Sequence, residues 1–170
     1  MGFGIAAARI IHVLGGVIWV GSMFFVSMFL IPSMTEAGPD AGKVMAALNR
    51  RKFMIIIPVI ALLTMLSGLW LYWRASMGFN SAYMASGPGK TYGLGATMAI
   101  LAFVIGMTMT RPAMVKMNKL MASAASASDT ERQTIMAQAA EARARGARWG
   151  RVIAFLLIGA ATLMALGHYV

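Results

Sequence analysis

The sequence predicts an all-α membrane protein: a four-transmembrane-helix up-down bundle with a cytoplasmic helical connection between helices 3 and 4. Hydrophobic residues make up 59% of the 170 positions, far more than in a soluble domain. They gather in four runs of about 20 residues, the length that an α-helix needs to cross a bilayer. The runs lack the polar faces of a soluble bundle. We expect one integral membrane domain, 1–170, with spans at about 8–31, 53–74, 91–112 and 150–170.

The first two spans are joined by a segment rich in helix breakers. Pro32 is expected to end the first helix, and the glycine- and proline-containing stretch that follows it is expected to be a loop. Residues 43–52 are expected to form a short interfacial helix that leads into the second span. Pro58 lies inside that span and should kink it.

The third span is expected to continue past Arg111 into the cytoplasm. Ser128 and Glu131 have the spacing of an N-terminal capping box, which predicts that a new helix begins near Asp129. That helix, through about residue 148, is rich in alanine and arginine. We expect it to lie on or near the inner membrane surface before the fourth span begins.

Basic residues are distributed unevenly between the two sides of the predicted bundle. The net charge is +10, and of the 15 Lys and Arg only Arg9, Arg74 and Lys90 lie outside the first and third connections. The positive-inside rule therefore predicts that both connections are cytoplasmic and that both termini lie on the outer, periplasmic side of a bacterial-type inner membrane. The charge indicates topology and attraction to the lipid bilayer, and we expect no nucleic-acid partner.

Several classes of chemistry are excluded by residues that the chain lacks. It has no cysteine, so disulfides and thiolate metal sites are absent. No acidic residue lies in a predicted span, which disfavours a proton pump. There is no nucleotide-binding loop, and the catalytic residues are unknown. Redox chemistry carried by a bound cofactor is the catalytic option that remains.

One face of the first span carries the candidate cofactor site. His12, Gly15, Gly16 and Trp19 share a side of the predicted helix, and Arg9 lies one turn further out. A haem needs an axial imidazole and room for its ring beside the helix, and the two glycines remove bulk below His12. Arg9 could then pair with a haem propionate. The same glycines would also suit close helix packing, and Trp19 could be a packing aromatic.

A second histidine, His168, lies near the end of the fourth span and is predicted to be in the same leaflet as His12. The two could ligate one haem b from both faces, serve two haems, or bind copper together with methionine. Either histidine could instead only hydrogen-bond a neighbouring carbonyl.

Methionine is abundant, with 17 residues, and clusters near the end of the third span. Thioethers suit Cu(I), but methionine also fills gaps in apolar cores. The cluster comprises Met107, Met109, Met114, Met117 and Met121.

The stretch "IIHVLGGVIWVG", with His12, Trp19 and Gly21, resembles the first helix of HemJ-type and CopD-type four-helix membrane proteins. The second span, "NRRKFMIIIPVIALLTMLSGLW", is similar to theirs in the order of its proline, threonine and glycine. The resemblance covers about residues 9–73. In this chain, the proline, threonine and glycine are Pro58, Thr64 and Gly68.

HemJ-type proteins are associated with haem b and porphyrinogen oxidation, and CopD-type proteins with copper uptake. The resemblance implies a haem-ligand role for His12 and a supporting role for Lys90. The chain departs from HemJ in lacking an arginine and a second histidine late in the first helix, which weakens the inference of that oxidase activity.

The leading hypothesis is a haem-b-binding inner-membrane protein with a redox or electron-transfer role, acting on a porphyrinogen or a quinone-type donor. His12 and His168 are the predicted metal ligands. The full set of predicted cofactor-binding residues is His12, His168, Arg9, Gly15, Gly16, Trp19 and Lys90. One alternative is copper handling, and another is a non-catalytic accessory subunit of a larger membrane complex. A homo-oligomer is also compatible with the sequence.

Overall fold

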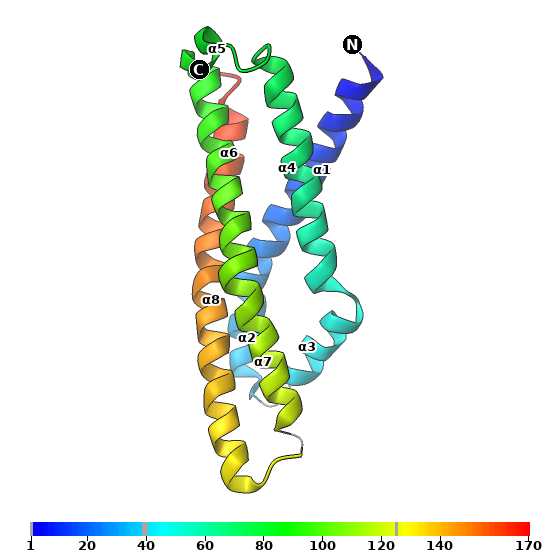
Figure 1. Ribbon diagram of the computed structural model, residues 1–170, viewed down its shortest axis with the longest axis vertical. Helices are drawn as coiled ribbons and strands as arrows, with labels where there is room; N and C mark the ends of the chain where they lie inside the picture. Colours follow the sequence, from blue (N-terminus) through cyan, green and yellow to red (C-terminus); the bar gives the residue numbers. More distant parts are fainter. Residues whose placement is uncertain (1, 39–40, 125) are drawn as a thin grey trace.

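The protein is all-helical over the part that the computed structural model describes, residues 2–38, 41–124 and 126–170. Four continuous helical stretches are long and apolar enough to cross a membrane, so the chain is a multi-pass membrane protein. Both ends of the chain lie at the same end of the bundle (Figure 1). The helices are α1 (Phe3–Phe25), η1 (Val26–Leu30), α2 (Ile31–Glu36), α3 (Ala41–Arg50), α4 (Phe53–Ala75), α5 (Ser81–Ala85), α6 (Gly87–Ile105), η3 (Gly106–Thr110), α7 (Arg111–Ser123) and α8 (Asp129–Leu166).

The first helical stretch does not end at Pro32, contrary to the sequence prediction. It passes through a π-helical turn, η1, and continues as α2. The N–H of Ile31 bonds to the carbonyl of Val26, five residues back, directly before the proline. Proline lacks an N–H and crowds the preceding turn, and a wider turn accommodates both effects inside a membrane helix.

The third helical stretch shows the same arrangement, and here the prediction that it continues past Arg111 is confirmed. The N–H of Arg111 bonds to the carbonyl of Gly106, again five residues back and directly before Pro112. Both π turns, η1 and η3, contact α8. They therefore mark two helices that change their path along the same neighbour.

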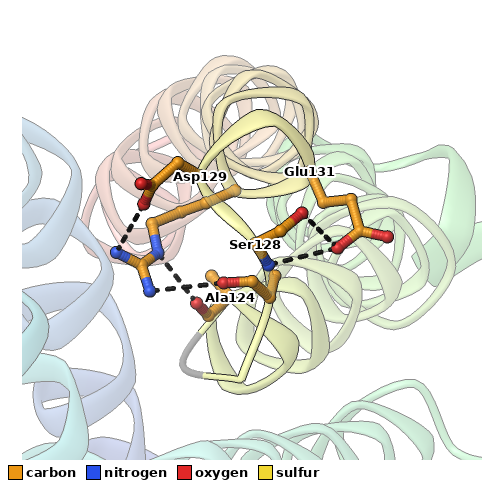
Figure 2. A network of polar contacts seen from close by, with 6 residues as sticks. Ala124, Ser128, Asp129 and Glu131 are labelled. Carbon is orange, nitrogen blue, oxygen red and sulfur yellow. Dashed lines mark hydrogen bonds and ion pairs between the residues drawn. The ribbon is translucent and has the colours of Figure 1, made fainter.

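The predicted capping box at the start of α8 is confirmed. The backbone N–H of Ser128 donates to Glu131 Oε2 at 3.1 Å, and its hydroxyl donates to the same oxygen at 2.6 Å. Arg132 bridges back to the end of the preceding helix, because its Nε donates to the carbonyl of Ala124 (Figure 2). Within α8, its Nη1 lies 3.7 Å from Asp129 Oδ1. These contacts close the tight connection between α7 and α8.

The predicted surface helix and the fourth span are one helix, which corrects the expectation of a separate helix on the membrane. α8 runs unbroken through 38 residues, so it is about 57 Å long at 1.5 Å per residue. Gly146 and Gly150 do not break it, because each lies against a neighbouring helix. A Cβ at Gly146 would be 3.3 Å from Met114 Sδ, and one at Gly150 would be 3.2 Å from Ser27 Oγ.

The four long stretches pack mainly as two pairs. α1 packs against α4, while α6 and α7 pack along α8, and α1 also contacts α8. Small residues allow this close approach, since a Cβ at Gly95 would lie 3.3 Å from the carbonyl oxygen of Ala160. Toward its N-terminus α1 diverges from α8 and crosses α4 (Figure 1).

Candidate functional site

His12 is half-buried on the face of α1 that packs against α4. Its Nδ1 lies 2.9 Å from the backbone carbonyl oxygen of Thr64. Because a carbonyl oxygen can only accept, Nδ1 must carry the proton in this hydrogen bond. A neutral His12 therefore keeps a lone pair on Nε2, the nitrogen that remains free to accept a proton or to bind a metal ion.

The ring of His12 lies directly on Gly68, one helical turn after Thr64. A Cβ added at Gly68 would overlap Cε1 of the ring and would lie 2.6 Å from Nδ1. Conversely, a Cβ added at Gly15 would overlap the Thr64 hydroxyl, which itself donates to the carbonyl of Ile60 at 2.8 Å. Each helix thus supplies one glycine that receives a side chain of the other, and the two helices interlock here.

The notch formed by Gly15 and Gly16 is filled by α4. Besides the overlap at Gly15, a Cβ at Gly16 would lie 3.9 Å from Thr64 Cγ2. A flat ring could lie against both glycines only if α4 moved away. Helix packing is therefore one role of the two glycines in the structure, and clearance for a cofactor ring stays a prediction.

The two predicted basic partners, Arg9 and Lys90, are exposed. Arg9 lies on α1 about one turn from His12 toward the chain start, where a charged group bound near His12 could reach it. Lys90 lies in the first turn of α6, a helix that contacts α4. Both roles stay predictions.

His168 is exposed and follows the end of α8, and its ring lies edge-on to Tyr169 with the centroids 5.9 Å apart. This end of α8 packs on α6, because a Cβ at Gly167 would overlap the ring of Tyr92. No hydrogen bond or ring contact within 2–38, 41–124 and 126–170 joins His168 to His12. Those ranges also hold no cluster of three or more His, Asp or Glu. A paired role for the histidines stays a prediction.

Trp19 belongs to the apolar core of the bundle. Only 4% of it is exposed, and its ring meets Phe103 edge-on with the centroids 6.4 Å apart. Ile57, Ile153 and Leu157 complete the surrounding cluster together with small residues. A packing role for Trp19 is thus present in the structure, and contact with a cofactor stays a prediction.

The methionine cluster divides between core and surface. Met114 and Met117 are buried against Ala139 and Ala142 of α8. Met109 and Met121 are exposed. The packing role that methionine plays in apolar cores accounts for the buried pair.

Sequence reasoning did not identify the partners of His12. The signal was present, because Thr64 and Gly68 are spaced by one helical turn and belong to the pattern quoted for the second span. It also missed two buried hydroxyls, Ser27 Oγ and Thr110 Oγ1, which have no hydrogen-bond partner among the described residues. Each of them lies in a π turn.

The spans and the His12 contacts place this chain in no known family by themselves. Comparison with protein-family models, curated proteins and solved structures gives no match, so the resemblance to HemJ-type and CopD-type proteins stays a prediction.

Proposed function

We propose that the protein binds haem b through His12 and has an electron-transfer role in the membrane. The observation that carries this proposal is the hydrogen bond from His12 Nδ1 to the Thr64 carbonyl oxygen. Metal-binding histidines commonly donate their other ring N–H to a carbonyl, which fixes the tautomer and raises the basicity of the ligating nitrogen. His12 has this arrangement, with Nε2 as the ligating atom.

The residues around His12 suit a ligand held in one orientation. Thr64 fixes the proton on Nδ1, and the absence of a side chain at Gly68 leaves room for the ring against α4. A bound haem would supply one-electron chemistry that the side chains of this bundle lack.

The charges of the chain support an orientation in a bacterial-type inner membrane. In this proposal the bundle is up-down, both chain ends face the outer side, and residues 129–148 of α8 extend into the cytoplasm. His12 then lies in the outer leaflet, and Arg9 lies closer to the outer surface, where a haem propionate would be. His168 is the proposed second ligand in the same leaflet.

The test is an ultraviolet–visible spectrum of the full chain purified from haem-replete cells. We expect a Soret band in the wild type and its loss in His12→Asn. Asparagine is the matched variant, because its amide nitrogen can still donate to Thr64 while the ligating Nε2 is gone. In His168→Ala the band should shift if His168 is the second ligand and stay unchanged if it is not.

Two results would overturn the haem proposal. The first is a colourless preparation, or one in which stoichiometric copper replaces haem on metal analysis. The second is a Soret band that is the same in His12→Asn as in the wild type.

A further inference from the structure

An apolar cavity of about 100 Å³ lies between α4 and the junction of α6 with η3. Its floor includes Trp19 and Ile153, which are buried. Half-buried side chains, such as Pro58 and Phe103, form its sides, so it reaches the lipid-facing surface of the bundle. α4 packs mainly on α1 and only lightly on α6, which explains why space remains on this side. The lining residues are Trp19, Met23, Phe53, Met54, Ile57, Pro58, Ala61, Ala102, Phe103, Gly106, Met107, Thr110, Arg111 and Ile153.

One part of this lining is polar, and its polar groups lack partners. Thr110 Oγ1 is buried without a hydrogen bond among the described residues. Other helical threonines, such as Thr97 and Thr108, donate to the carbonyl four residues earlier. Arg111 lies next to Thr110 and is exposed, and its guanidinium has no ion pair or hydrogen bond in the described part of the chain. An occupant would therefore need an apolar body and a group that accepts hydrogen bonds.

We propose that this cavity is a binding site for an anionic glycerophospholipid, with part of one acyl chain in the cavity and the phosphate against Arg111 and Thr110. The charges nearby favour an anion. Arg111 itself lines the cavity, and Lys52 directly precedes the lining residue Phe53. No acidic residue lines the cavity. A quinone would also offer an apolar tail and hydrogen-bond acceptors, but it carries no charge to match the guanidinium.

Trp19 provides a direct readout of the cavity. Because Trp19 is 4% exposed, bulk lipid cannot touch it, and only a chain inside the cavity can. Bromine atoms on an acyl chain quench tryptophan fluorescence on contact. The other three tryptophans, Trp70, Trp73 and Trp149, would be replaced by phenylalanine, and the full chain would be reconstituted with chain-brominated phosphatidylglycerol or phosphatidylcholine.

We expect phosphatidylglycerol to quench Trp19 more strongly than phosphatidylcholine at equal mole fraction. Arg111→Gln should reduce the apparent affinity for phosphatidylglycerol about fivefold, the factor equivalent to about 1 kcal/mol for one basic residue near a lipid surface. Lys119→Gln is the matched control, because it removes an exposed charge outside the cavity lining. Thr110→Val should weaken binding without a change in charge. Gly106→Leu should lower quenching by both lipids, since its side chain would enter the cavity.

Three outcomes would overturn the proposal. Absence of quenching by either lipid would show that no chain enters the cavity. Equal quenching by the two lipids, unchanged in Arg111→Gln, would show that no headgroup is recognised. Relief of the quenching by an added ubiquinone analogue, but not by unbrominated phosphatidylglycerol, would assign the cavity to a quinone.

Discussion

Replacing Gly68 with alanine tests how α1 and α4 are held together. The new Cβ would lie 2.6 Å from His12 Nδ1, while ordinary contact begins at 3.4 Å, so the ring must withdraw by about 0.8 Å. A withdrawal of that size along the bond to Thr64, now 2.9 Å, would break it. Overpacking costs about 1–3 kcal/mol and the lost hydrogen bond about 1 kcal/mol, whereas alanine gains about 1 kcal/mol in helix propensity. We expect a net destabilisation of about 1–3 kcal/mol.

In a His12→Ala background, Gly68→Ala should stabilise the protein instead of destabilising it. The nearest atoms that the new Cβ meets all belong to His12, so without the ring only the gain in helix propensity remains. The coupling free energy between the two positions should therefore be about 2–4 kcal/mol. Equilibrium unfolding of the full chain in detergent micelles measures it, with Gly21→Ala as a control because nothing lies within 4 Å of a Cβ there. An equal cost of Gly68→Ala in both backgrounds would refute the interlock.

Three further predictions concern helix contacts, capping and titration. Gly95→Leu should lower the unfolding free energy by about 1–3 kcal/mol in thermal unfolding followed by circular dichroism, because its Cβ would lie 3.3 Å from the Ala160 carbonyl oxygen, which belongs to rigid α8 backbone. Ser128→Ala should lower the stability of the first turn of α8 by about 1 kcal/mol, seen as faster hydrogen exchange there but not in α6. Burial, with smaller contributions from two neighbouring tyrosines, raises the pKa of Tyr83 above its usual 10.0. Its phenolate should therefore form at a higher pH than that of an ordinary tyrosine in an absorbance titration, and Tyr83→Phe should remove this component. The stability that the neutral phenol provides should be lost as the pH rises above 10.

The spans and the capping box follow from local sequence, and that part of the fold could be predicted. A run of apolar residues specifies a membrane helix regardless of its neighbours, and Ser128 and Glu131 interact within one turn. The continuation through Pro32 could not be predicted from the same rules, because proline ends helices in water. In a membrane, the cost of free backbone groups favours a π turn over a break.

The unbroken course of α8 and the environment of His12 depend on tertiary contacts. Gly146 and Gly150 weaken an isolated helix, but Met114 and Ser27 pack against them here. The sequence indicated that His12 is unusual, but not that it lies between Thr64 and Gly68. Which side chain fills a glycine notch depends on how two helices cross, and that crossing is not encoded within either helix alone.

The two π turns change which face each helix presents to its neighbours. A wide turn holds one residue more than an α-turn, so every side chain beyond it is rotated by about 100° relative to a continuous α-helix. Past η3, this rotation sets which side of α7 meets α8, and Met114 and Met117 are buried there. The bundle can therefore use one stripe of residues for contacts in one half of its length and a different stripe in the other. A single-residue deletion at either turn would rotate everything that follows in that helix by about 100°, so that a different stripe of residues would face the neighbouring helix.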